Sequence, residues 1–271
     1  MKFEHTKVSN FEGAFRGLRN PKNSWHLSDS YFGLYEKDTM VKDKLVASKW
    51  CEGATEFLDY YIAKLQKNGI LNEQDGIVEG AFIGPKDMAL AQKLIAAGAE
   101  HRKFLRQIFV SVDITAPLYW WKEMDTYKVA TVANSTSTMH KLAETPITLD
   151  CFETDDFNSE LVYYELPKFV GEAKNDVGML ADFIIEQLEF LRQKYLQTKD
   201  VRYWKELIRW LPEGWLQKRT WTANYETIRA ICSKSQRRNH KLTEWSESFI
   251  EWARTLPYAQ YLIFDDENKK F

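Results

Sequence analysis

The sequence contains little cysteine. Only three of its 271 residues are cysteines, Cys51, Cys151 and Cys232. They are odd in number, lie far apart, and do not have the spacing of metal ligands. The pattern therefore argues against a disulfide framework and against a structural metal site, and it is typical of a protein from a reducing compartment.

Long apolar runs are also absent. No stretch approaches the roughly 18 apolar residues that a membrane-spanning helix needs. The first residues do not contain the apolar core of a signal peptide. We therefore expect a cytoplasmic protein with no membrane segment.

The chain lacks a strong net charge, internal repeats and low-complexity tracts. Its formal net charge of −2 provides no overall attraction to nucleic acid or to an anionic membrane. With 44% hydrophobic residues, the chain is long enough to bury a sizeable core. Such a length allows one elaborated domain or two small ones, and we expect a single domain over residues 1–271.

Aromatic residues, by contrast, are abundant. Ten tryptophans and 13 tyrosines indicate a large aromatic core, an oligomer interface, or platforms for flat ligands. Composition alone leaves these three possibilities open.

The most informative stretch runs from His101 to Lys141. His101 follows an apolar helix, and after it come a strand-like run over 108–114 and an aromatic helix that begins at Leu118. The stretch ends in a hydroxyl-rich segment, 134–138, flanked by cations. Hydroxyls, backbone amides and cations together suit an anionic ligand such as a phosphate. The alternative is an ordinary capped loop, because serine, threonine and asparagine are also common turn and N-cap residues.

Hydrophobic periodicity and capping signals predict most of the remaining elements. We expect strands over 1–10, 77–83 and 108–114. We expect helices over 11–19, 41–68, 88–97 (with Asp87 as N-cap), 178–198, 201–210 and 243–256 (with Thr243 as N-cap). The segment 144–182 is acidic and poorly periodic, so we interpret it as an extended loop, possibly an insertion.

A second candidate site lies in the C-terminal third. Residues 219–229 suggest a helix with Asn224 near its N-terminus. A compact basic cluster of Arg237, Arg238, His240 and Lys241 follows it. The cluster is either an anion-binding turn or a solvated turn between helices.

The order of His101, strand, aromatic helix and hydroxyl-rich segment resembles the flavin-dependent thymidylate synthases. In that family a helix leads into Arg-His-Arg-x-x-Ser-x-Asn-Glu-x-Ser-x-Arg-Tyr. Aligned without gaps, the family's asparagine and second serine fall on Asn134 and Ser137, and its leading histidine falls on His101. Its Arg-His-Arg triplet falls on residues 127–129, and its glutamate falls on Ser135. The layout is thus retained while the signature arginines are replaced.

The resemblance implies an α+β fold with a central, mostly antiparallel sheet wrapped by long helices, as in the thymidylate synthase-complementing proteins. It implies methylation of dUMP at C5, with methylenetetrahydrofolate as carbon donor, reduced FAD as hydride carrier and NADPH to reduce the flavin. It also implies a homotetramer with sites shared between subunits.

The same resemblance assigns roles to individual residues. Arg238 and Ser137 would be catalytic, the flavin would be held by His101, Lys128, Asn134 and Asn224, and the nucleotide would be held by Ser135, Ser137, His140, Arg237 and Arg238. Lys128 would replace an arginine by a point charge, which loses the arginine's forked hydrogen bonding. No metal site is implied.

Two alternatives remain open beside this enzyme. The chain could keep the fold and bind a pyrimidine nucleotide without flavin. It could also bind single-stranded nucleic acid, with the basic cluster beside Trp221, Tyr225 and Trp245 as stacking platforms. The slightly acidic charge balance argues against nucleic acid.

Overall fold

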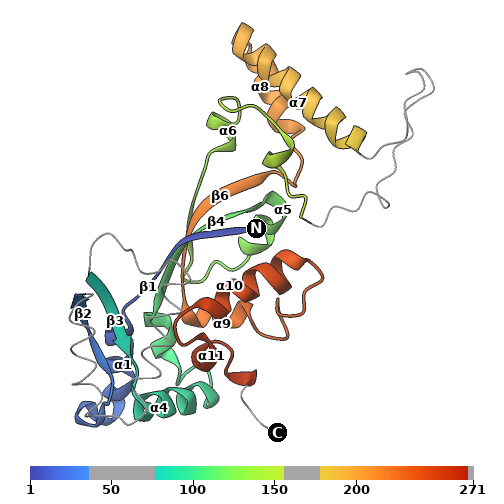
Figure 1. Ribbon diagram of the computed structural model, residues 1–271. Helices are drawn as coiled ribbons and strands as arrows, with labels where there is room; N and C mark the ends of the chain where they lie inside the picture. The colour runs from blue at the N-terminus through green and yellow to red at the C-terminus, as the bar shows by residue number, and fades with distance from the viewer. Residues whose placement is uncertain (37–76, 156–177, 268–271) are drawn as a thin grey trace. The chain divides into compact units, whose positions relative to one another are not determined.

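The computed structural model describes residues 1–36, 77–155 and 178–267 (Figure 1). The strands are β1 (Lys2–Ser9), β2 (Tyr31–Glu36), β3 (Ile77–Phe82), β4 (Phe109–Pro117), β5 (Val132–Ser135) and β6 (Leu216–Asn224). The α-helices are α1 (Phe11–Arg19), α4 (Pro85–Ala96), α5 (Leu118–Met124), α6 (Thr138–Lys141), α7 (Gly178–Thr198), α8 (Val201–Arg209), α9 (Tyr225–Ile231), α10 (Ile250–Thr255) and α11 (Ala259–Leu262). Shorter helical turns are η1 (Asn20–Lys22), η2 (Trp25–Leu27), η3 (Lys103–Gln107), η4 (Leu149–Cys151), η5 (Glu244–Phe249) and η6 (Asp265–Glu267).

Four strands form an antiparallel sheet in the order β1-β4-β6-β5. Strands β2 and β3 form a separate antiparallel pair, in which Tyr31 is opposite Phe82 and Glu36 is opposite Ile77. The expected α+β class with a mostly antiparallel sheet is confirmed. In the described part of the chain, no helix is both long enough and apolar enough to span a membrane.

Most predicted elements are confirmed, and three expectations need comment. The predicted helix over 41–68 lies outside the described residues. The helix predicted within 219–229, with Asn224 near its N-terminus, is confirmed as α9, which begins at Tyr225 with Asn224 as N-cap, whereas residues 219–224 belong to strand β6. The acidic segment 144–182 contains turn η4, and α7 already begins at Gly178; residues 156–177 lie outside the description.

The chain divides into two compact units. Unit 1 comprises Met1–Lys2, Ile114–Tyr127 and Asn134–Thr220. Unit 2 comprises Phe3–Asp113, Lys128–Ala133 and Trp221–Phe271.

Aromatic side chains build the core of unit 2. Phe3 of β1 stacks on Trp252 of α10, with ring centroids 5.1 Å apart and planes 8° from parallel. Phe249 contacts both Trp252 and Trp245, with ring centroids 5.2 and 5.5 Å apart. The large apolar side chains of the predicted 243–256 helix are therefore buried. Thr243 precedes this helix but makes no side-chain capping bond.

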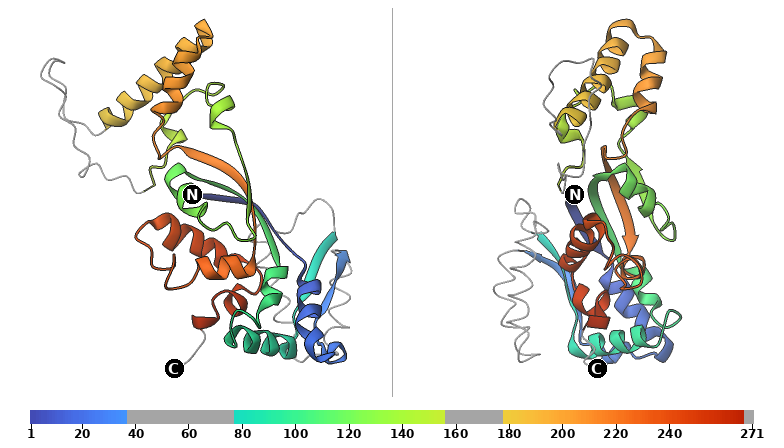
Figure 2. Two further views of the ribbon diagram at one scale, coloured as in Figure 1. Left: turned by 180° about the vertical axis from the view of Figure 1, so that it is seen from behind. Right: turned by 90° about the vertical axis from the view of Figure 1, so that its right-hand side faces the viewer.

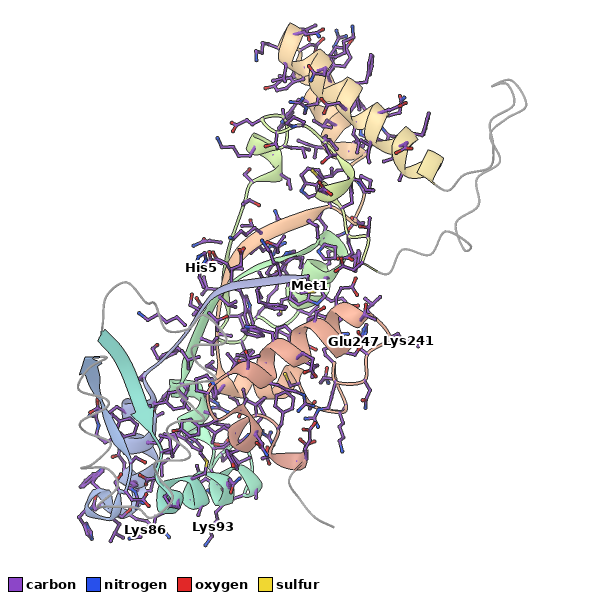
Figure 3. The ribbon with its side chains drawn as sticks, in the orientation of Figure 1. Met1, His5, Lys86, Lys93, Lys241 and Glu247 are labelled. Atoms are coloured by element: carbon purple, nitrogen blue, oxygen red, sulfur yellow. The ribbon has the colours of Figure 1, made fainter. Side chains whose placement is uncertain are left out.

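The start of α4 in unit 2 differs from the prediction. Asp87 is not the N-cap, because the helix already begins at Pro85. The carboxylate of Asp29 accepts hydrogen bonds from the backbone N–H groups of Lys86 and Asp87, at 2.8 and 3.0 Å. These are two of the first N–H groups of the helix, which have no partner within it. Lys86 and Lys93 lie on the exposed side of α4 (Figure 3).

Asp87 instead lies at the centre of a buried polar cluster. Its carboxylate accepts hydrogen bonds from Arg19 Nε at 2.5 Å, from the Ser28 hydroxyl at 2.6 Å and from the Ser30 hydroxyl at 2.5 Å. Both Arg19 and Asp87 are buried. A buried charge is tolerated when it is paired and hydrogen-bonded in this way, so the cluster joins α1 to α4.

Unit 1 contains a smaller apolar core under two antiparallel helices. Helices α7 and α8 lie side by side (Figure 2). The two helices and the 142–147 segment share an apolar core. Its buried residues are Leu142, Ile147, Leu188 and Leu207. Arg192 of α7 donates to the carbonyl of Ala143 at 3.0 Å and so holds the 142–147 segment against the helix.

Candidate functional site

The hydroxyl-rich segment of unit 1 is anchored by hydrogen bonds at Thr136, and the two residues before Thr136 are exposed. Thr136 donates through its backbone N–H and its hydroxyl to the carbonyl of Lys218, at 2.9 and 3.2 Å. Gln217 Nε2 donates to the carbonyl of Thr136 at 2.8 Å. Asn134 and Ser135, at the end of β5, are exposed. An amide and a hydroxyl are thus presented to solvent from a position that strand β6 holds in place.

Ser137 and His140 lie at the short helix that follows. The carbonyl of Ser137 accepts a hydrogen bond from the N–H of Lys141 at 3.1 Å, and His140 lies on α6. Lys141 pairs with Glu144 at 2.8 Å on the surface. The structure therefore places Asn134, Ser135, Ser137 and His140 within seven consecutive residues of unit 1.

Arg219 of unit 1 was not among the predicted site residues. Its guanidinium lies over the ring of buried Trp121, 4.4 Å from the centroid. The same group donates to Gln217 Oε1 at 2.9 Å and to the Asp125 carboxylate at 3.0 Å. The signal for it was the alternation of Gln217 and Arg219 along a strand, but no strand was predicted over these residues.

In unit 2, Asn224 is the N-cap of α9. Its Oδ1 accepts a hydrogen bond from the Thr227 N–H at 2.9 Å, and the residue is only 3% exposed. The Thr227 hydroxyl donates to the carbonyl of Val129 at 3.1 Å. Because Val129 follows Lys128 directly, this bond ties the exposed Lys128 segment to the start of α9. The two predicted flavin residues Lys128 and Asn224 are connected in this way.

His101 is exposed, and its neighbour Arg102 makes the tertiary contact. The N–H of His101 donates to the carbonyl of Gly98 at 3.0 Å, which closes a turn. Arg102 Nε donates to both carboxylate oxygens of Glu226 at 2.9 Å. Glu226 lies in the first turn of α9, so the His101 turn is also held to that helix.

The two arginines of the basic cluster have different environments. Arg238 donates through Nε to the carbonyl of Cys232 at 2.8 Å and through its two terminal nitrogens to the Asp266 carboxylate at 2.8 and 2.9 Å. Its side chain is only 8% exposed. Arg237 is half-buried, and its guanidinium lies 4.9 Å from the centroid of the Trp245 ring.

Electrostatics around Arg238 favour a structural pair. Burial would raise the pKa of Asp266, but the hydrogen bonds and charge of Arg238 outweigh it, so that the pKa lies below its usual value. Burial raises the pKa of the Cys232 thiol far above its usual value, which makes a thiolate nucleophile there unfavourable.

Comparisons with known proteins give one consistent result. No protein-family model matches the sequence, and neither does any curated protein. The solved structures that are similar to this chain include two of the flavin-dependent thymidylate synthase ThyX from Helicobacter pylori, complexed with FAD and dUMP. Each is 14% identical in sequence to this chain and covers 98% of it, with TM-scores of 0.56 and 0.54; the aligned parts span 99% and 98% of the ThyX chains.

The chain has the ThyX fold. On this fold, the predicted residues divide between the two units. Those of the hydroxyl-rich segment belong to unit 1, whereas His101, Lys128, Asn224, Arg237 and Arg238 belong to unit 2. Within unit 2, contacts to α9 fix the segments that carry His101 and Lys128.

The ThyX-fold structure argues against one alternative. Trp221, Tyr225 and Trp245 were predicted as stacking platforms for a single-stranded nucleic acid, and that prediction is wrong. All three are buried, at 2%, 0% and 0% exposure, so that their faces pack within unit 2.

The described residues also contain no group of three or more His, Cys, Asp or Glu side chains that could hold a metal ion.

Proposed function

We propose that this protein binds FAD and dUMP and methylates the nucleotide at C5. Methylenetetrahydrofolate would be the carbon donor, and NADPH would reduce the flavin. The observation that carries this proposal is the similarity to FAD- and dUMP-complexed structures over 98% of the chain.

The described residues fit a phosphate-bearing ligand. Asn134 and Ser135 present exposed hydrogen-bond groups, and Lys128 presents an exposed cation. Asn224 is fixed at the start of α9, because its Oδ1 caps that helix. FAD, when bound, would supply the hydride for methyl formation. The protein's share would be to position the reactants and to stabilise charge.

The contacts divide the roles of the two arginines. Arg238 already uses Nε and both terminal nitrogens in bonds to Cys232 and Asp266. Arg237 is held by its stacking on Trp245. Because the donors of Arg238 are engaged in this way, we assign the support of the turn to Arg238. The nucleotide contact is then assigned to Arg237, the other arginine that the resemblance offers. The resemblance also assigns Ser135, Ser137 and His140 to the nucleotide, and it assigns His101, Lys128, Asn134 and Asn224 to the flavin.

The deciding experiment is the visible absorption spectrum of the purified protein, recorded before and after incubation with FAD and dialysis. A retained flavin spectrum that changes when dUMP is added is the expected result. Methylation at C5 replaces the C5 hydrogen, so tritium release from 5-tritiated dUMP then reports the reaction. A colourless protein that cannot be loaded with FAD would contradict the proposal.

One substitution favours a second candidate, a nucleotide-binding protein without flavin. The family's Arg-His-Arg triplet is Tyr127-Lys128-Val129 here, and a lysine lacks the forked hydrogen bonding of an arginine. This candidate predicts dUMP binding, measured by calorimetry, in a protein that gives no flavin spectrum.

A further inference from the structure

A buried glutamine of β6 holds the hydroxyl-rich segment (134–138) from within unit 1. Gln217 is only 6% exposed, and its Nε2 donates to the carbonyl of Thr136 at 2.8 Å. Its Oε1 accepts a hydrogen bond from Arg219 Nε at 2.9 Å. Both polar atoms of the amide are therefore engaged, the nitrogen by the segment and the oxygen by the arginine.

These two partners allow the Gln217 amide only one orientation. A guanidinium can only donate hydrogen bonds, and a carbonyl can only accept them. If the amide turned over, its NH₂ group would face the guanidinium of Arg219 and its oxygen would face the carbonyl of Thr136. Both hydrogen bonds would be lost, and a buried polar group without a partner is costly. Arg219 therefore determines which atom of Gln217 faces the hydroxyl-rich segment.

Arg219 is itself held by two further contacts. Its guanidinium lies 4.4 Å from the centroid of the Trp121 ring, and it donates to both carboxylate oxygens of Asp125 at 3.0 and 3.1 Å. Trp121 Nε1 also donates to the backbone carbonyl of Gln217 at 2.9 Å. All four residues belong to unit 1, and together they form a network that ends at the hydroxyl-rich segment.

The network fixes the backbone at Thr136. The Thr136 N–H belongs to the peptide group shared with Ser135, and it donates to the carbonyl of Lys218 at 2.9 Å. The Thr136 carbonyl belongs to the peptide group shared with Ser137, and Gln217 donates to it. Because a peptide group is planar and rigid, these two hydrogen bonds fix both peptide planes next to Thr136. The positions of the two serines are thus determined from β6.

We propose that Gln217 is a positioning residue for the hydroxyl-rich segment, and that Arg219 keeps its amide in the required orientation. The ligand part of this inference rests on the function proposed above, in which Ser135 and Ser137 bind dUMP. Groups that are already in place bind a ligand more tightly than groups that must be ordered on binding. Loss of the network should therefore weaken dUMP binding.

Flavin binding should be affected less. Three of the four residues assigned to the flavin, His101, Lys128 and Asn224, belong to unit 2, whereas the network lies in unit 1. A general loss of folding would instead weaken both ligands together. The ratio of the two affinities therefore distinguishes a positioning role from a merely structural one.

The first experiment measures hydrogen exchange over residues 134–138 in protein without ligands. Gln217→Met removes both hydrogen bonds of the amide at similar side-chain length. Gln217→Glu keeps an acceptor for Arg219 but places a carboxylate oxygen against the Thr136 carbonyl. Both variants should exchange about fivefold faster in this segment, with no comparable change elsewhere. Gln197→Met, the same substitution at an exposed glutamine of α7, is the matched control.

The second experiment measures dUMP by calorimetry and FAD by fluorescence titration. Gln217→Glu and Arg219→Met should each lower dUMP affinity by about fivefold and change FAD affinity little. Arg219→Lys retains a donor for Gln217 Oε1, so it should recover part of the lost affinity. Urea unfolding of each variant checks that the fold is intact.

The outcomes separate this inference from the proposed function. Normal exchange over 134–138 in Gln217→Glu and in Arg219→Met would overturn the positioning role, whether or not Gln217→Met folds. Exchange that rises equally throughout the chain, or equal losses of dUMP and FAD affinity, would overturn it as well. If the unchanged protein binds no dUMP, the proposed function fails, while the exchange measurement still tests the network.

Discussion

Arg238 and Asp266 form a two-pronged ion pair across 28 residues of sequence, with terminal nitrogens and carboxylate oxygens 2.8 and 2.9 Å apart. Arg254 pairs with Glu267 in the same way, at 2.7 and 2.8 Å. Arg229 joins Asp265 at 2.8 and 2.9 Å. The three consecutive acidic residues of η6 are therefore each held by a different arginine of unit 2.

This arrangement predicts that Arg238 supports stability. Arg238→Met should lower the free energy of unfolding by about 3 kcal/mol, because the partly buried Asp266 is left without its partner. Asp266→Asn should lower the free energy of unfolding by less, because Arg238 Nε still donates a hydrogen bond to the Cys232 carbonyl. A double-mutant cycle in urea measures the coupling. Additive effects of the two substitutions would show that the pair contributes nothing.

Arg237 should behave differently from Arg238. Arg237→Ala should lower dUMP affinity by about tenfold or more, because a charge-assisted contact is lost, while changing stability little. Arg237→Lys keeps the charge and should recover part of the affinity. Calorimetric titration with dUMP and a urea curve on the same protein separate the two effects. Unchanged dUMP affinity in Arg237→Ala would reject the assignment.

Glu189 predicts a pH dependence of unit 1. Hydrogen bonds from Arg192 lower the pKa of Glu189 from its usual value to about 2, against the opposing effect of burial. A carboxyl with a lowered folded-state pKa stabilises the fold above its unfolded pKa. That stability is lost as the pH falls from about 4.5 toward 2.

The size of this effect is at most about 3 kcal/mol at neutral pH. Glu189→Gln should remove it and should flatten the fall in melting temperature between roughly pH 5 and pH 2. Glu186→Gln, an exposed neighbour on the same helix, is the control. Parallel melting curves for the Glu189 variant and the unchanged protein over this range would contradict the prediction.

Ser137 tests the proposed division between nucleotide and flavin. Ser137→Ala should weaken dUMP more than FAD, because its hydroxyl is assigned to the nucleotide. Ser135→Ala, two residues earlier, should show the same order. Fluorescence titration measures FAD and calorimetry measures dUMP. A greater loss of FAD than of dUMP would reject the role.

Long amphipathic helices could be predicted closely from the sequence. Helix α7 was expected over 178–198 and is observed at Gly178–Thr198. Its buried face repeats over many turns, so single substitutions do not hide the period. Strand β6 was not predicted, even though buried Trp221 and Ala223 alternate with less buried neighbours, because only the helix that follows Asn224 was recognised in this segment.

The site could be predicted only in part, because its chemistry depends on distant partners. The N-cap position of Asn224 was visible from local sequence. The sequence around Arg237 and Arg238 could not distinguish the two, since the difference arises from Asp266 and Trp245. Arg102 was overlooked for the same reason, because its partner Glu226 is 124 residues away.

Asp29 provides the clearest test of a cap that local sequence does not reveal. Its carboxylate accepts hydrogen bonds from the N–H groups of Lys86 and Asp87 at the start of α4. These two residues lie 57 and 58 positions after Asp29 in the sequence. Asp29→Ala should therefore cost about 1 kcal/mol of stability, as the loss of an N-cap does.

The neighbouring glycine gives a matched variant. A Cβ added at Gly84 would lie 2.3 Å from the backbone oxygen of Asp29, so Gly84→Ala should displace the Asp29 segment. Because both changes disturb the same cap, the double variant should lose less stability than the sum of the two single losses. Strict additivity in urea unfolding would mean that Asp29 does not cap α4.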